Sequence, residues 1–236
     1  VSGAWGEIYA RRVILAAGGQ ALPKSGSDGY GYTLARALGH TLTPRIFPAL
    51  VPLTLPRDHW LTALSGVAVD AAIALRSGVG KLMQRFENAL LCTHFGLSGP
   101  AVLDISRYYL DAHAQDPAAT LSIHWLPDKP AETIDAELLA HGKSSLLRYL
   151  TPRLPERLAR ALCAQAGIEI GQPAHALTRE QRRALVHLLS ATPLPISGSR
   201  GFTYAEVTAG GVPLDEVQLR TMESLMCEGL YLCGEL

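Results

Sequence analysis

Val13-Ile14-Leu15-Ala16-Ala17-Gly18-Gly19 is the stretch that decides the fold of this chain. A continuous apolar run is typical of a buried strand in a parallel sheet, so we expect a strand over 12–17 that the two glycines end. A shorter strand is expected before it, over 7–10. After a loop, residues 28–38 predict a helix that ends at Gly39. A strand, two glycines, a loop and a helix in this order indicate part of an α/β domain.

The pattern changes after Pro44, where prolines recur along an apolar stretch, as in edge strands and domain crossings. Residues 67–75 then alternate with the period of a half-buried strand, and Gly78 to Gly80 predict a hairpin turn. Further strands are expected over 87–93, 121–125 and 202–208. Several antiparallel strands at this spacing predict a small β-barrel or sandwich.

Between Pro127 and Pro195 the pattern becomes helical. Prolines stand where the first turns of helices are expected and glycines where helices end, at Pro130, Pro155, Gly142 and Gly167. The residues from Thr178 to Gln181 match a capping box ahead of an apolar helix face. We expect a separate bundle of about three or four helices, inserted into the β domain.

Composition excludes several classes of protein. Over 236 residues, Lys and Arg total 21 and Asp and Glu total 21, so the chain has no excess of positive charge. This balance argues against a protein that binds nucleic acid or an anionic membrane mainly by electrostatic attraction. Apolar residues make up 48%, enough for a sizeable core, and no apolar run reaches the length of a membrane span. The four cysteines lack metal-binding spacing and are too few for a disulfide framework. We expect a cytoplasmic protein without a metal site.

Four familiar motifs are incomplete or absent. Gly80-Lys81 resembles the end of a P-loop, but Leu75 and Leu82 stand where glycine and a hydroxyl are required. Residues 29–31 begin a dinucleotide fingerprint that Leu34 interrupts. The stretch 96–99 is no nucleophile elbow, because a proline follows it. The histidines form no zinc-hydrolase pair.

What remains is a set of glycine-rich segments at predicted strand ends. They are 16–19, 26–32, 93–100, 208–212 and 229–235. Each segment alone indicates only a turn. Together and in this order they are much more specific.

In that combination the segments resemble the BaiN-like family of FAD-dependent flavoproteins, which includes an aminoacetone oxidase. The resemblance covers nearly the whole chain, apart from the less distinctive helical part. It implies a Rossmann-like FAD-binding α/β domain with an inserted β-barrel that itself carries a helical insertion. The implied parts are an FAD domain over 1–44 and 214–236, a β-barrel over 45–127 and 193–213, and a helical insertion over 128–192.

The resemblance also implies cofactor contacts. The family's Ala-Thr-Gly-Gly segment matches 16–19, with Ala17 in place of threonine, and its final Gly-Glu or Gly-Asp matches Gly234-Glu235. Backbone close to a dinucleotide favours glycine. We therefore expect the cofactor to lie near Ala17, Gly18, Gly19, Gly96, Gly99, Gly210, Gly211, Gly234 and Glu235.

The family's G-x-G-x-x-G loop, which holds the pyrophosphate, has no match here. The chain begins at Val1 without methionine and stops directly after a predicted strand. We expect it to be a piece of a longer protein that binds FAD weakly or not at all and is inactive alone.

Pro100 is predicted to begin an amphipathic helix with Val102, Ile105, Tyr109 and Ala112 on its apolar face. The free N–H groups at the start of this helix favour a negative charge nearby, such as the charge of a reduced flavin. The alternative interpretation is that the start of the helix is buried and binds no ligand.

His94, inside a glycine-rich segment, is the candidate catalytic acid or base, although most lone histidines are structural. Six others are expected on surfaces without a special role, namely His59, His113, His124, His141, His175 and His187. Cys233 is expected to be a small buried residue.

Two functions follow. The first is an FAD-dependent oxidoreductase that moves a hydride between flavin and NAD(P)H or a small organic substrate, with no nucleic-acid or membrane partner. The alternative is a non-enzymatic protein-interaction module, in which the helical insertion docks a partner and the glycine loops are structural. A yellow whole protein favours the first, and a colourless one that captures a protein partner favours the second.

Overall fold

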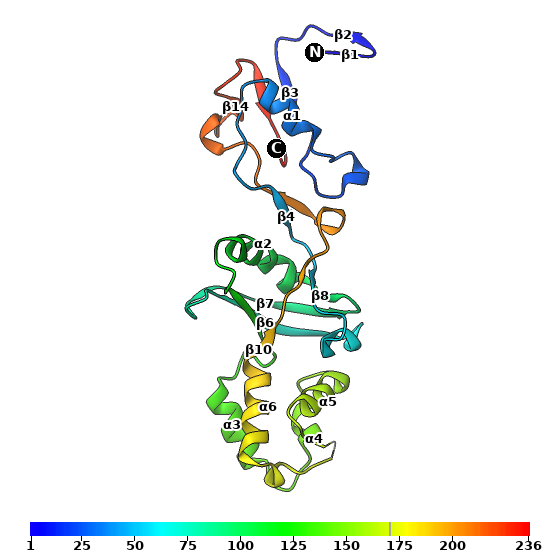
Figure 1. Ribbon diagram of the computed structural model, residues 1–236, viewed down its shortest axis with the longest axis vertical. Coiled ribbons are helices and arrows are strands. Elements are labelled where there is room, and N and C mark those ends of the chain that lie inside the picture. The colour runs from blue at the N-terminus through cyan, green and yellow to red at the C-terminus, as the bar shows by residue number, and fades with distance from the viewer. Residues whose placement is uncertain (170) are drawn as a thin grey trace. The chain divides into compact units, whose positions relative to one another are not determined.

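The computed structural model describes residues 1–169 and 171–236 and divides into two compact units (Figure 1). The first unit comprises Val1–Val51 with Arg200–Leu236, and the second comprises Pro52–Ser199. Each unit contains both helix and sheet. The prediction of a mixed α/β chain built from several parts is confirmed at this level.

The first unit is built on a four-stranded sheet with the order β13-β14-β15-β3. Strand β15 (Leu230–Leu232) runs parallel to β3 (Val13–Leu15), so the predicted apolar strand exists and pairs with the last strand of the chain. Helix α1 (Tyr30–Ala37) contributes Ala35 to a buried cluster that also includes Leu15. The remaining strands of this sheet are β13 (Val217–Gln218) and β14 (Glu223–Ser224).

Shorter elements complete the first unit. Strand β12 (Val207–Ala209) pairs antiparallel with β4 (Phe47–Ala49), and β1 (Ser2–Gly3) forms a hairpin with β2 (Gly6–Glu7). The 3₁₀ helices are η1 (Pro23–Ser25), η4 (Phe202–Tyr204) and η5 (Leu214–Glu216).

Three strand predictions in this unit were wrong in extent. The strand expected over 12–17 stops at Leu15, where the amide of Cys233 donates the last ladder bond to the Leu15 carbonyl at 3.1 Å. The strand expected over 7–10 is only the end of the β2 hairpin, and its exposed residues cover no core. The strand expected over 202–208 begins instead as a 3₁₀ turn, in which Tyr204 N–H donates to the Gly201 carbonyl at 3.1 Å.

The second unit is built on a seven-stranded antiparallel sheet with the order β10-β9-β6-β7-β8-β5-β11. The alternating stretch forms β6, and Gly78 to Gly80 lie in the predicted hairpin turn between β6 and β7. The strands are β5 (Leu53–Thr54), β6 (Ala68–Arg76), β7 (Leu82–Thr93), β8 (Gly96–Ser98), β9 (Thr120–His124), β10 (Thr192–Leu194) and β11 (Gly198–Ser199).

Helix α2 (Pro100–Gln115) packs on this sheet against β6 and β7, and the 3₁₀ helix η2 (Trp60–Leu64) lies beside β7. Pro100 occupies the first helical position, as predicted, and Gly99 precedes it with a φ of 89°. The apolar face of α2 is buried as the sequence indicated, at Val102, Ile105, Tyr109 and Ala112.

Four helices follow in the predicted helical part, α3 (Ala131–Ala140), α4 (Leu146–Leu150), α5 (Glu156–Gln165) and α6 (Arg179–Ala191). A short 3₁₀ helix, η3 (Ala174–Ala176), precedes α6. The capping box is present, because the Thr178 hydroxyl accepts from Gln181 N–H and the Gln181 side chain accepts from Thr178 N–H. Gly142 and Gly167 have positive φ just beyond α3 and α5, as helix-ending glycines do.

The expectation of a separate bundle was wrong, because these helices share one core with the sheet. Leu158 and Leu185 of the helices belong to the same buried cluster as Ile73 of β6. At the join, the indole N–H of Trp125 donates to the Thr192 hydroxyl at 2.8 Å, in a buried contact. Helices this short are marginal alone and gain their stability by packing on the sheet.

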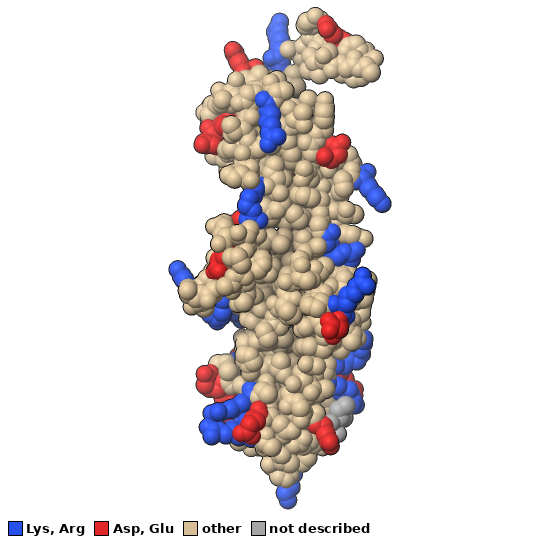
Figure 2. Space-filling model, viewed as in Figure 1, with Lys and Arg blue, Asp and Glu red and all other residues tan. Residues whose placement is uncertain are grey.

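On the face shown in Figure 2, basic and acidic side chains are interspersed among the described residues. Among the helices in the part of the chain that the structure describes, none combines the length and the apolar character needed to cross a membrane.

Candidate functional site

Three of the predicted glycine segments meet in the first unit, and we call Gly18-Gly19, Gly210-Gly211 and Gly234-Glu235 the glycine junction. A Cβ added at Gly19 would lie 2.5 Å from Thr208 Oγ1, and one added at Gly211 would lie 2.6 Å from the Leu236 carbonyl carbon. These contacts join segments that are far apart in sequence. They meet because β3 and β15 are parallel, so the residues after both strands lie at the same edge of the sheet.

Thr208 connects the junction. It belongs to the predicted segment 208–212, but the sequence analysis gave it no role of its own. Its hydroxyl accepts hydrogen bonds from the N–H groups of Gln20 at 2.8 Å and Ala21 at 2.9 Å. Its own N–H donates to Glu235 Oε2 at 3.1 Å. Thr208 therefore ties the loop after β3 to the end of β15, and Glu235 has a structural role beside any role toward a cofactor.

Tyr32, at the end of the predicted segment 26–32, is a second residue to which the sequence analysis gave no role. Its hydroxyl donates to the Glu235 carbonyl at 3.3 Å. Burial raises the pKa of Tyr32, and the negative charge of Glu235 raises that pKa further. The phenol is therefore a neutral hydrogen-bond donor at the junction. Ala17 packs against α1 at Gly31, with its Cβ 2.9 Å from the position that a Cβ at Gly31 would take.

The glycines of the junction differ in what surrounds them. Gly19, Gly210 and Gly211 are crowded by the protein itself, since a Cβ at Gly210 would lie 2.2 Å from the Arg45 carbonyl oxygen. Gly234 is exposed, has a φ of +90°, and would place a Cβ with no atom within 4 Å. Only Gly234 therefore offers open backbone that a flat group can approach.

A pocket of about 480 Å³ includes Gly234 in its lining. Cys233 also lines it and is exposed, so the expectation that this cysteine is buried was wrong. In a strand side chains alternate between faces, and the buried neighbour Leu232 leaves Cys233 pointing outward. The open backbone and the apolar Ile14 and Met222 of this pocket fit the approach of a flat, partly apolar cofactor.

Gly96 and Gly99, the other predicted cofactor glycines, belong to the second unit and are explained there by strand packing. A Cβ at Gly96 would lie 2.4 Å from the Leu53 carbonyl oxygen in β5. A Cβ at Gly99 would lie 2.9 Å from the Ala89 carbonyl oxygen in β7. Their contacts with a cofactor remain predictions.

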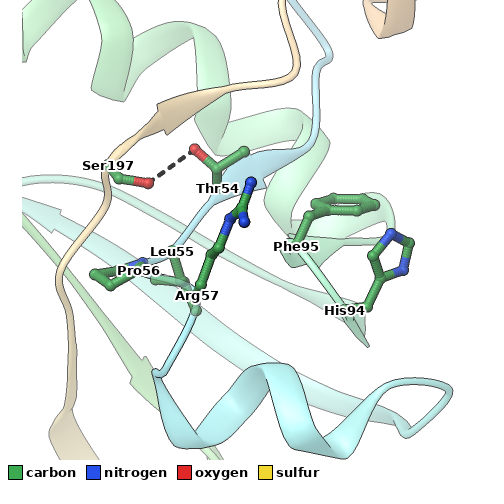
Figure 3. Close-up of a pocket in the computed structure, with 7 residues that line it drawn as sticks. All are labelled: Thr54, Leu55, Pro56, Arg57, His94, Phe95 and Ser197. Carbon is green, nitrogen blue, oxygen red and sulfur yellow. Dashed lines mark hydrogen bonds between the residues drawn. The ribbon is translucent and has the colours of Figure 1, made fainter.

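His94 lies in the turn between β7 and β8 and lines a pocket of about 670 Å³ (Figure 3). Its ring meets the ring of Phe95 edge-on, with centroids 5.1 Å apart. The side chain is exposed, and neither ring nitrogen has a hydrogen-bond partner among the described residues. The ring nitrogens of His94 are therefore accessible to a ligand in this pocket, and its catalytic role remains a prediction.

His40, the one histidine left out of the sequence analysis, is buried in the first unit. Its Nδ1 lies 2.9 Å from Glu216 Oε2, and its Nε2 lies 2.8 Å from Ser224 Oγ. The series of contacts from Glu216 through His40 to Ser224 resembles the acid–histidine–serine triad of acyl-transfer enzymes. However, Ser224 is buried, and its hydroxyl accepts from the N–H groups of Met226 and Cys227. The arrangement therefore ties the segment after α1, which carries His40, to η5 and β14, and no sequence motif marks it.

Glu216 makes the stability of the first unit depend on pH. Hydrogen bonds from the Thr41 hydroxyl and N–H and from His40 hold the pKa of Glu216 below its ordinary value. A carboxyl of this kind stabilises the fold above its unfolded-state pKa of about 4.3, and the contribution is lost as pH falls through the folded-state pKa. We expect Glu216→Gln to destabilise the chain in urea at neutral pH and to match the parent chain in acid.

Glu228→Gln is the control for Glu216→Gln, because Glu228 is exposed and has no hydrogen-bond partner among the described residues. An equal loss of stability for Glu216→Gln in acid and at neutral pH would contradict the linkage.

Comparison with known proteins identifies a family and several relatives for this chain. Residues 47–207 match the family model described as "HI0933-like protein barrel and H2TH domain". The chain is 35% identical to the 3-dehydro-bile acid delta(4,6)-reductase of Clostridium scindens over 96% of its length and 56% of that protein. It is 36% identical to the ribosomal RNA dihydrouridine synthase of Escherichia coli over 97% of its length and 54% of that protein.

A third relative, the ribosomal RNA dihydrouridine synthase of Haemophilus influenzae, is 33% identical over 95% of this chain and 53% of that protein. The chain thus spans about half the length of the curated relatives that it matches. The family match covers more than half of the chain. The chain belongs to the HI0933-like, BaiN-like family of FAD-dependent flavoproteins, the family that its glycine segments predicted.

Proposed function

We propose that the whole protein is an FAD-dependent reductase and that FAD lies against the glycine junction. The observation that carries this proposal is the open backbone of Gly234, exposed at the carboxyl end of β15 beside a pocket of about 480 Å³. Ligands of open parallel sheets bind at this end of the strands. Gly18, with a φ of +70°, turns the chain away from the same edge after β3.

The reaction class follows from the names of the relatives. A delta(4,6)-reductase and a dihydrouridine synthase both concern a carbon–carbon double bond in a ring. Bound reduced FAD would supply a hydride to one carbon of such a bond. His94, in a pocket of the second unit, is the proposed proton donor. NAD(P)H is the proposed source of the hydride.

The relatives differ in substrate, and an assay decides between the two classes. The balanced charge of this chain favours a small molecule without nucleic acid. Two relatives are named for ribosomal RNA instead. We expect the whole protein to oxidise NAD(P)H with a 3-oxo-4,6-diene steroid and not with a uridine-containing RNA. The reverse result would replace the small-molecule substrate by RNA.

The test of the cofactor site is FAD content. We expect the whole protein to purify yellow, with about one FAD per chain, and Gly234→Ala to lose much of it, since a Cβ would fill the open backbone face. Gly6→Ala is the matched control, because Gly6 also has positive φ and open space around its Cβ position. Full occupancy in Gly234→Ala would contradict the site. A colourless whole protein that captures a protein partner would favour the interaction module.

The chain as given is expected to bind FAD weakly or not at all and to show no turnover. Titration of FAD into the chain by flavin fluorescence measures this.

A further inference from the structure

Backbone hydrogen bonds to the sheet hold part of the wall of the pocket around His94. Its lining comes from 54–57, from the turn at 94–95 and from Ser197 (Figure 3). Leu55 N–H donates to the Phe95 carbonyl at 3.0 Å, and Ser197 N–H donates to the Thr54 carbonyl at 2.9 Å. These bonds extend the sheet into the pocket wall. The volume of about 670 Å³ is in the range of small-molecule sites.

Arg57 is the one permanently charged side chain in this lining. It is exposed, and its guanidinium has no ion-pair or hydrogen-bond partner among the described residues. None of the seven lining residues that Figure 3 labels is acidic. A guanidinium without a carboxylate partner at the wall of a pocket favours binding of an oxyanion, with which it forms paired, charge-assisted hydrogen bonds.

Two hydroxyl groups in the lining add a further donor. Thr54 Oγ1 and Ser197 Oγ lie 3.0 Å apart and share one hydrogen bond. One of the two hydroxyl hydrogens makes this bond, so the other is available to a ligand. Arg57 and Thr54 both line this pocket, and both are drawn in Figure 3. The pocket therefore holds a cation and a neutral donor, with apolar surface from Leu55 and Pro56.

We infer that this pocket binds an anionic group of the substrate, a phosphate or a carboxylate, through Arg57 and the Thr54–Ser197 hydroxyl pair. This inference rests on the proposed function and deepens it, because it specifies that the substrate carries a negatively charged group. It also divides the work within the pocket. Arg57 binds and positions the substrate, whereas His94 exchanges the proton.

The test measures binding to the chain without FAD, so it does not depend on the cofactor. Isothermal titration compares uridine 5′-monophosphate with uridine, and cholate with its methyl ester, since each pair differs in an anionic group. We expect the anionic member of at least one pair to bind and its neutral partner to bind at least about tenfold more weakly. Inorganic phosphate should compete with a bound phosphate ester, and acetate with a bound carboxylate.

Arg57→Ala should weaken the anionic probe about tenfold, and Arg57→Lys, which keeps the charge but not the paired donors, should weaken it less. Arg148→Ala is the control, because Arg148 is an exposed arginine of α4 outside this lining. Equal affinity for the neutral and anionic members, no binding at millimolar concentration, or an unchanged affinity in Arg57→Ala would overturn the inference. A colourless whole protein would instead overturn the proposed function and leave this site standing.

Discussion

Gly19→Ala is expected to destabilise the first unit by about 3 kcal/mol, from overpacking together with the loss of two hydrogen bonds. The backbone of Gly19 is not in the positive-φ region, so alanine meets no backbone strain there. The cost arises because the added Cβ would lie 2.5 Å from Thr208 Oγ1 and 2.8 Å from the Tyr32 hydroxyl. Thr208 cannot retreat without releasing the N–H groups of Gln20 and Ala21.

Hydrogen exchange at the amides of Gln20 and Ala21 measures this loss directly. We expect about a hundredfold lower protection in Gly19→Ala, the equivalent of about 3 kcal/mol at 1.4 kcal/mol per factor of ten. Gly26→Ala is the control, since Gly26 has positive φ but no atom within 4 Å of its Cβ position. This variant therefore measures the effect of backbone strain without the effect of steric crowding. In a Thr208→Ala background the substitution should cost much less. Unchanged protection of both amides in Gly19→Ala would show that the junction is not packed as described.

Local patterns predicted the elements in which one face or one cap decides the structure. The alternation of apolar residues over 67–75 forms β6, and the capping box at Thr178 begins α6. Such signals lie within a few residues of one another, so the sequence displays them. The extents of the short strands in the first unit were less predictable, because strand ends depend on the partner strand rather than on the run itself.

The site was predictable only where glycine marks a close approach of backbone. Gly19 and Gly211 were identified in this way, whereas Thr208, which joins them, is an ordinary threonine in the sequence. His40 and Arg57 were missed for the same physical reason. His40 is defined by partners about 180 positions away, Glu216 and Ser224, and Arg57 by a pocket wall that exists only after folding.

His94→Gln is expected to lower kcat of the whole protein at least about a hundredfold, the usual contribution of a positioned acid or base. Glutamine keeps a hydrogen-bond donor of similar reach but has no proton to transfer near neutral pH. The fold should be unaffected, because the His94 side chain is exposed and makes no hydrogen bond to the described residues. The turn that carries it is held by other groups, including the Thr93 hydroxyl, which donates to the Gly96 carbonyl at 3.0 Å.

The division of roles in the pocket sharpens this prediction. If His94 moves the proton, His94→Gln lowers kcat and leaves KM within a few-fold, whereas Arg57→Ala raises KM and affects kcat much less. The matched control is His187→Gln, an exposed histidine on α6 outside this pocket, which should retain full activity. A solvent deuterium isotope effect on kcat in the parent protein would place proton transfer in the slow step. If kcat in His94→Gln stays within about twofold of the parent value, His94 is not the proton donor. The role of its ring is then limited to packing against Phe95 at the wall of the pocket.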